Sequence, residues 1–272
     1  MMASSQPLIQ QRMMRILIKR DKTMNARYLV VSDMQVPFQF DAAIKNLKKL
    51  VNAFKFDLVM SVGDEMDFNT ISKWSEGKAE SFEQTLNADR DLCKEILYDL
   101  KMDVISRSNH SDRLFKSLTR IPGLMELPEL QYEKFMSFDD LGIYYAKKPF
   151  EIPGTSFVLC HGDEGTMSRV GGSTALGLAR RWGRSVISGH THRMGYQAQS
   201  EAFGGRLERV LVGIEVGHTC NIAKMSYLAK GAYYANWQAG AVILTIKRGN
   251  LSVEMIRFNT DGSFSALGKA FG

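Results

Sequence analysis

The sequence predicts an α/β (α+β) sandwich in which two packed mixed β-sheets are flanked by helices. Two observations support this prediction: apolar runs alternate with helical patterns in the first half of the chain, and strands follow one another from Thr155 onward. A chain of 272 residues with 44% hydrophobic residues can bury one large core. Because no linker rich in Pro, Gly or Ser interrupts it, we expect a single domain over residues 26–272, preceded by a basic extension over residues 1–25.

In the first half, a helix separates each expected strand from the next. Apolar side chains in residues 41–55 recur at the spacing of one helix face, whereas the flanking apolar runs are short enough for strands. The expected strands span residues 27–33, 56–64 and 102–110, and the expected helices span residues 41–55 and 82–101.

In the second half, strands dominate and one helix is expected over residues 173–182. Strand–helix alternation followed by successive strands favours two packed sheets with helices on their outer faces. The expected strands span residues 155–163, 184–192, 205–215, 240–249 and 251–258.

Composition excludes several classes of protein. Cys93, Cys160 and Cys220 are widely spaced and form no C-x-x-C pair, so neither a disulfide framework nor a zinc knuckle is expected, and a reducing cytosol is indicated. The apolar run near the N-terminus is too short for a secretory signal or a membrane span, so no membrane partner is expected. The net charge of +6 suits an anionic ligand such as a nucleotide or nucleic acid.

Five of the expected strands end in a cluster of polar side chains. Ligands of α/β sheets bind beyond the carboxyl ends of the strands, so these clusters are expected to share one rim. On a strand, the two histidines of the last cluster would point the same way, because side chains repeat with a period of two. The clusters are Asp33 with Gln35, Asp64 with Asp67, Asn109 with His110, His161 with Asp163, and His190 with His192.

The donor types at this rim indicate a metal site. Imidazoles, carboxylates and a neutral amide oxygen, without thiolate, favour Mn, Fe or Zn over a soft-metal or structural zinc site. The candidate ligands are too many for one ion. Two ions about 3.5 to 4 Å apart, bridged by one carboxylate, would account for them and would form the clamp used in phosphoryl transfer.

The ordered series "SDMQ", "GDEMD", "SNHSD", "CHGD" and "GHTH" resembles the motifs of the calcineurin-like metallophosphoesterases, over residues 27–195. Residues 161–195 are also similar to stand-alone members encoded by bacteriophages. The resemblance implies that His110 stands near the leaving-group oxygen and that Asp67 orients it. It further implies two sets of metal ligands that share a bridging carboxylate: Asp33, Gln35, Asp64 and His192 for one ion, and Asp64, Asn109, His161 and His190 for the other.

Three positions depart from the family pattern or add to it. Gln35 stands where the family usually has His, and its amide oxygen is a weaker and harder donor, which puts the first ion in doubt or favours manganese or magnesium there. Ser108 replaces the usual glycine of the third motif, and the following Ser111 leaves the role of Asp112 open. Arg113, close behind that motif, is a candidate phosphate contact.

We therefore expect a phosphodiesterase that hydrolyses nucleic acid or (cyclic) nucleotides through a hydroxide activated by two divalent ions, with His110 donating the proton to the leaving group. Mn²⁺ is the favoured metal, and Fe, Zn, Mg and Ni are the alternatives. A phosphomonoesterase acting on nucleotides or phosphoproteins is the alternative enzyme, and a non-catalytic scaffold is the alternative of another class. The expected location is the cytoplasm, which is the host cytoplasm for a phage-encoded protein.

Overall fold

The computed structural model describes residues 25–225 and 236–272. The predicted basic extension, residues 1–25, therefore lies outside the described residues except for Asn25. In the part of the chain that is described, none of the helices combines the length and the apolarity needed to cross a bilayer.

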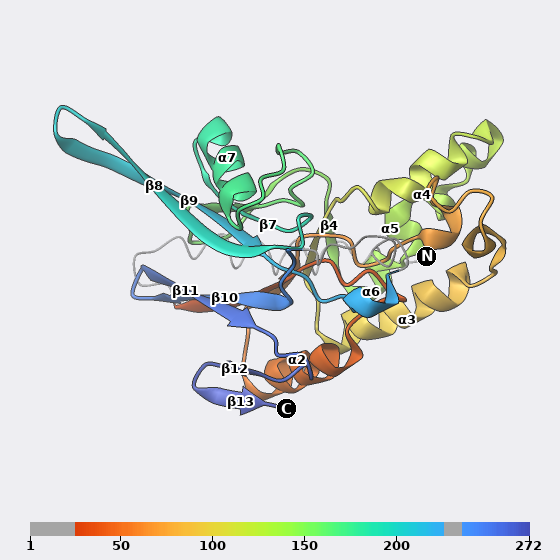
Figure 1. Ribbon diagram of the computed structural model, residues 1–272, viewed down its shortest axis with the longest axis horizontal. Helices are drawn as coiled ribbons and strands as arrows, with labels where there is room; N and C mark the ends of the chain where they lie inside the picture. Colours follow the sequence, from red (N-terminus) through yellow and green to blue (C-terminus); the bar gives the residue numbers. More distant parts are fainter. Residues whose placement is uncertain (1–24, 226–235) are drawn as a thin grey trace, which may run out of the picture.

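Two large β-sheets form the centre of the fold, as predicted (Figure 1). Each sheet mixes parallel and antiparallel strands, and the parallel neighbours are β1 with β2, β2 with β3, β3 with β4, β6 with β7, and β7 with β9. The first sheet has the order β11 (Asn250–Arg257), β10 (Gly240–Lys247), β1 (Ala26–Val31), β2 (Leu58–Ser61), β3 (Val104–Ser106), β4 (Tyr144–Ala146). The second has the order β5 (Phe150–Glu151), β6 (Phe157–Leu159), β7 (Ser185–Ser188), β9 (Arg206–Val216), β8 (Met194–Phe203).

Helices cover the outer faces of both sheets (Figure 1). The helices α2 and α3 pack on the first sheet, and α7 packs on the second. A small third sheet of β12 and β13 lies beside α2. The bounds are α2 (Asp41–Ala53), α3 (Leu86–Asp99), α4 (Ser111–Leu118), α5 (Tyr132–Phe135), α6 (Phe138–Leu141), α7 (Ser173–Trp182), β12 (Phe264–Ala266) and β13 (Lys269–Phe271).

Alternation along β1 shows how the sequence builds these layers. Tyr28 belongs to the core between the two sheets, together with Ile187 of β7. Its neighbour Leu29 points to the other face and packs with Leu47 of α2 and Leu97 of α3. All of these side chains are completely buried, and each such side chain contributes about 1.5–3 kcal/mol to folding. A strand that is apolar on both faces is therefore the signature of a central sheet covered on both sides.

Two elements near the site were not expected from the sequence. The strand β8, "MGYQAQSEAF", carries little apolar periodicity, but pairs with β9 over its whole length to form the projecting hairpin in Figure 1. The helix α4 begins directly after His110, inside the third motif.

Gly213 of β9 lets α7 approach the second sheet, because a Cβ there would collide with the backbone of Leu176.

Candidate metal centre

The polar clusters lie just beyond the carboxyl ends of five strands. Because β1, β2 and β3 are parallel neighbours, and β6 and β7 are parallel neighbours, the ends of these strands meet at one edge of each sheet. Each cluster is two or three residues past the last residue of its strand. The first polar residues are Asp33 after β1, Asp64 after β2, Asn109 after β3, His161 after β6 and His190 after β7.

The backbone is strained at most of the predicted ligands. A left-handed φ costs a residue other than glycine about 1–3 kcal/mol, so it persists only where surrounding contacts enforce it. Here the loops enforce it on one another, since the N–H of Gln35 donates to the carbonyl of Asp64 at 2.9 Å. The residues concerned are Asp33 (φ 47°), Gln35 (φ 51°), Asp64 (φ 59°), His190 (φ 65°) and His192 (φ 56°).

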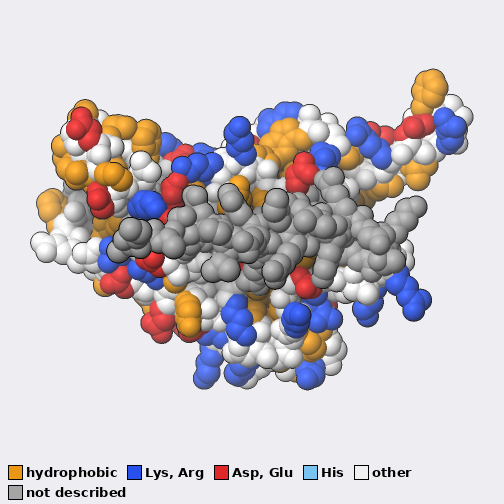
Figure 2. Space-filling view, turned by 180° about the vertical axis from the view of Figure 1, so that it is seen from behind, with side chains coloured by type: hydrophobic (Ala, Val, Ile, Leu, Met, Phe, Trp, Pro, Cys, Tyr) orange, Lys and Arg blue, Asp and Glu red, His pale blue; other side chains and the backbone are white. Residues whose placement is uncertain are grey.

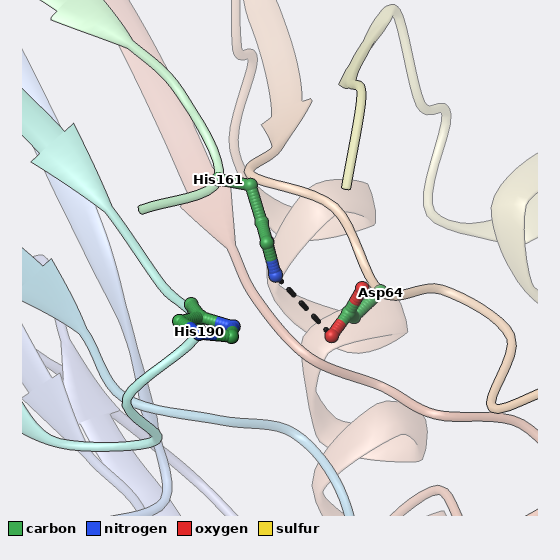
Figure 3. Close-up of side chains that lie close together, drawn as sticks. All are labelled: Asp64, His161 and His190. Carbon is green, nitrogen blue, oxygen red and sulfur yellow. Dashed lines mark ion pairs between the residues drawn. The ribbon is translucent and has the colours of Figure 1, made fainter. Parts of the chain in front are cut away.

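Four predicted ligands from both sheets come together in a first cluster. Nε2 of His161 lies 3.3 Å from Oδ2 of Asp64 and 2.8 Å from Oδ1 of Asn109. One donor atom each of Asp64, His161 and His190 lie within 4.8 Å of one another, and these three side chains point toward a common centre (Figure 3). This is a ligand set suited to one divalent cation.

The other three predicted ligands form a second cluster beside the first. Nε2 of His192 lies 3.1 Å from Oδ1 of Asp33 and 2.9 Å from Nε2 of Gln35. Oε1 of Gln35 is buried without a hydrogen-bond partner among the described residues. A cation would satisfy this oxygen, and a rotation of the amide would turn it toward His192. The backbone N–H of His190 donates to Oδ2 of Asp33 at 3.0 Å, and this hydrogen bond joins the two clusters.

The electrostatics of both clusters suit added positive charge. Burial alone would raise the pKa of Asp64, but the imidazoles of His110 and His161 hold it well below its usual value. Burial opposes a charge on His161, yet the carboxylates of Asp64 and Asp33 raise its pKa to about 10. Without a metal this site therefore retains a proton at neutral pH, which a bound cation would displace. The donor set of Asp64, His161 and His190 fits a divalent ion.

His110 stands beside the first cluster at the start of α4. Its Nε2 is 3.6 Å from Oδ2 of Asp64, and its Nδ1 is 3.7 Å from Oδ2 of Asp67. Arg113, one turn further along α4, reaches back to the same pair: Nη2 lies 2.8 Å from Nε2 of His110, and Nη1 donates to Oδ1 of Asp67 at 3.2 Å. Burial lowers the pKa of His110 below its usual value. The three residues predicted for catalysis and phosphate contact are thus neighbours, and their roles stay predictions.

The histidines of "GHTH" reach the site in a different way from the one expected. The strand β7 ends at Ser188, so His190 and His192 belong to the following loop rather than to the strand. Their left-handed backbones aim them at separate clusters, His190 toward Asp64 and His192 toward Asp33. The period-two argument for parallel rings was therefore wrong.

The departure at Ser108 has a structural explanation. Its Oγ accepts hydrogen bonds from the N–H of Asp64 (3.1 Å) and of Ser111 (3.2 Å), which ties the second motif to the third. A Cβ on Gly63 would come within 2.6 Å of the Cβ of Ser108, so glycine at the facing position provides the room for serine here.

Arg107 was missed by the sequence reasoning, although it directly precedes the third motif. Its Nη1 donates to both carboxylate oxygens of Asp163 at 2.8 Å, and its Nε donates to Oδ1 of Asp112 at 3.2 Å. Asp112, whose role the sequence left open, and Asp163 are thus partners of Arg107. The network joins the loop that carries Asn109 to the loop that carries His161.

The site opens into a cavity of about 700 Å³. Its floor includes Asp64, His110 and His192. Trp237 lines the wall and lies edge-on to His192, with ring centroids 4.1 Å apart. The fifth histidine, His218, is buried behind His192 at a centroid distance of 5.5 Å, and burial lowers its pKa to about 3, so it is neutral.

Comparison with known proteins gives phage relatives. The "Gene 54 protein" of Mycobacterium phage D29 is 32% identical over 256 residues, covering 88% of this chain and 98% of the relative. The "Gene 54 protein" of Mycobacterium phage L5 is 31% identical over 255 residues, with the same coverage. No protein-family model matches the chain.

Among solved structures, Vacuolar Protein Sorting 29 from Cryptosporidium parvum aligns with a TM-score of 0.44 and 13% identity, over 87% of this chain and 99% of that chain. A metallophosphoesterase from Sphaerobacter thermophilus aligns with a TM-score of 0.43 and 14% identity, over 87% and 89%. These identities and TM-scores are too low to assign roles to the residues of this chain. The chemistry of the site is therefore inferred from its own residues.

Proposed function

This chain belongs to the same protein family as the gene 54 proteins of Mycobacterium phages D29 and L5. On that premise we propose that it is a metal-dependent phosphodiesterase with the calcineurin-like fold, acting on nucleic acid or (cyclic) nucleotides. The observation that carries the proposal is the convergence of carboxylate, imidazole and amide donors from both sheets beside one further histidine, His110.

The two clusters would hold two divalent ions, of which Mn²⁺ is favoured by the mixture of oxygen and nitrogen donors. Asp33, Gln35 and His192 would hold one, Asn109, His161 and His190 the other, and Asp64 would be shared. When bound, such ions offset the negative charge on the phosphoryl oxygens and make water acidic enough to attack at neutral pH. A scaffold that only binds a partner has no need of this whole set of buried donors.

In the proposed reaction, water adds to phosphorus, one P–O ester bond breaks, and the leaving alkoxide takes up a proton. His110 is the donor we assign, because it is the imidazole at the cavity floor that belongs to neither ligand set. Asp67 faces its Nδ1 and would stabilise the protonated ring. Arg113, now against Nε2 of His110, would turn its Nη2 to a phosphoryl oxygen once a substrate is bound.

A diester is favoured over a monoester because the cavity of about 700 Å³ extends past the predicted ligands to Trp74 and Lys78, which leaves room for a second group on the phosphorus. The phosphomonoesterase alternative remains, since Arg113, Lys78 and Arg193 at the cavity wall also suit a dianion. We propose the host cytoplasm as its location, because the relatives are phage proteins.

The test compares bis(p-nitrophenyl) phosphate with p-nitrophenyl phosphate. We expect hydrolysis of the diester to be faster, to stop after dialysis against a chelator and to return with Mn²⁺. Asp64→Ala should empty or disorganise both metal sites, which metal analysis measures directly. Faster hydrolysis of the monoester would favour the alternative, and no hydrolysis of either ester by the Mn²⁺-loaded protein would reject an enzyme.

A further inference from the structure

A tryptophan that the proposed mechanism does not use, Trp74, lines the cavity. Trp74 lies in the segment between β2 and α3 and lines the cavity that contains His110 and Arg113, yet its side chain is 69% exposed. Nζ of Lys73 lies 4.7 Å from the ring centroid, which is cation–π distance. Because the exposed ring lines the cavity, it offers an aromatic face to a ligand that enters the cavity.

Lys78 and Arg193 place two further positive charges on the lining of the same cavity. Nζ of Lys78 donates to the carbonyl of Trp74 at 2.5 Å, and Nη1 of Arg193 donates to the carbonyl of Ser168 at 2.8 Å. Neither side chain forms an ion pair with a carboxylate of the described residues, in contrast to Arg113, which pairs with Asp67. Cations beside a phosphoester site suit further phosphates of the same substrate.

On the face shown in Figure 2, Lys and Arg side chains are spread over several elements and are interspersed with Asp and Glu. A net charge of +6 alone does not select a nucleic acid, so the substrate class is inferred from the side chains of the cavity.

We propose that Trp74 stacks on an unpaired nucleobase next to the scissile phosphate, while Lys78 and Arg193 bind the neighbouring phosphates, so that the substrate is single-stranded nucleic acid. This inference rests on the proposed phosphodiesterase activity and names its substrate class. In a duplex each base is already stacked on both faces, whereas an unpaired base offers a face to an aromatic side chain. Trp74 is thus a specificity-determining residue.

The experiment uses the full chain loaded with Mn²⁺ and two short single-stranded oligonucleotides that differ only in their bases. One carries normal bases, and the other carries abasic tetrahydrofuran residues at every position. Stacking on one base predicts that kcat/KM is about 5- to 150-fold higher for the normal oligonucleotide than for the abasic one. Trp74→Ala should remove this preference and Trp74→Phe should restore part of it.

Phe82→Ala is the matched control. Phe82 lies in the same segment as Trp74 and is 78% exposed, but does not line the cavity. This variant should keep the full preference for bases. Equal cleavage of the two oligonucleotides by the unchanged protein, or a preference that survives in Trp74→Ala, would overturn the proposal, as would equal cleavage of the annealed duplex.

The flanking phosphates are tested separately. Lys78→Ala should lower the slope of log kcat/KM against log salt concentration by about 0.7 on a tetranucleotide, and should leave the slope on a dinucleotide unchanged. Equal kcat/KM for the dinucleotide and the tetranucleotide would refute the role of the two cations.

The outcomes separate this inference from the proposed function. If the protein hydrolyses bis(p-nitrophenyl) phosphate but neither oligonucleotide, the substrate class is wrong while the phosphodiesterase activity stands. If it hydrolyses no diester at all, the proposed function itself fails.

Discussion

Arg107→Met is predicted to weaken metal binding through residues that are not themselves ligands. Arg107 donates to Asp163, two residues after His161, and to Asp112, three residues after Asn109. Burial opposes its charge, but hydrogen bonds and charges of Asp112 and Asp163 raise the pKa of Arg107 further above its usual value. Methionine keeps most of the length of the side chain and removes every one of these hydrogen bonds.

The magnitude follows from burial. The side chains of Arg107 and Asp112 are each 29% exposed, and that of Asp163 is 17% exposed, so the network is neither a surface pair nor a fully buried one. Breaking a buried pair costs about 3–5 kcal/mol, whereas exposed pairs contribute about 0–1 kcal/mol. We therefore expect the free energy of unfolding to fall by about 2 kcal/mol, and the affinity for Mn²⁺ to fall about 10- to 100-fold as the two ligand loops separate.

Urea unfolding of the chelated protein measures the stability, and calorimetric titration with Mn²⁺ measures the affinity. Arg184→Met is the control, because the ion pair of Arg184 with Glu151 is exposed and long, at 3.5 Å. Arg107→Lys should be intermediate, since lysine cannot make the bidentate contact. An Arg107→Met protein that is less stable but binds Mn²⁺ as tightly as before would refute the reasoning.

The remaining predictions concern the proton donor, a buried acid and a glycine of the site. His110→Ala should retain both metals and lose about 10²- to 10⁴-fold in turnover on diesters with poor leaving groups; loss of metal in stoichiometric analysis would contradict its role. Burial raises the pKa of Glu65 to about 7 from 4.5, so the native state holds more protons than the unfolded state between these values and stability falls as the pH rises through this window. We compare Glu65→Gln with the unchanged chain, both chelated, by urea unfolding at several pH values. The free energy of unfolding of the variant should rise relative to that of the unchanged chain by about 3 kcal/mol between about pH 4.5 and pH 8. A difference that stays constant with pH would argue against the raised pKa. A Cβ at Gly189 would collide with Ser32 and Asp33, so Gly189→Ala should cost about 1–3 kcal/mol by thermal unfolding and impair metal binding, whereas Gly177→Ala, with open space around it, should do neither.

Much of the fold was predictable because burial leaves a local signature. The expected strand over residues 56–64 contains β2, and the expected helix over residues 82–101 contains α3, since a buried strand is apolar on both faces and a helix repeats its apolar face. The strand β8 gave no such signal: one face of the hairpin is open to water, and its pairing with β9 is made by the backbone. The helix α4 is short and begins within a motif whose residues are chosen for the site rather than for helix formation.

The sequence by itself determined which donors stand after which strands, because a strand ends where its apolar run ends and parallel strands bring their ends to one edge. Only the tertiary structure decided that Arg107 joins the loops of Asn109 and His161, and that Trp74 lines the same cavity as His110. These relations join residues far apart in the chain, and local periodicity carries no information about distances that are set by how two sheets pack against each other.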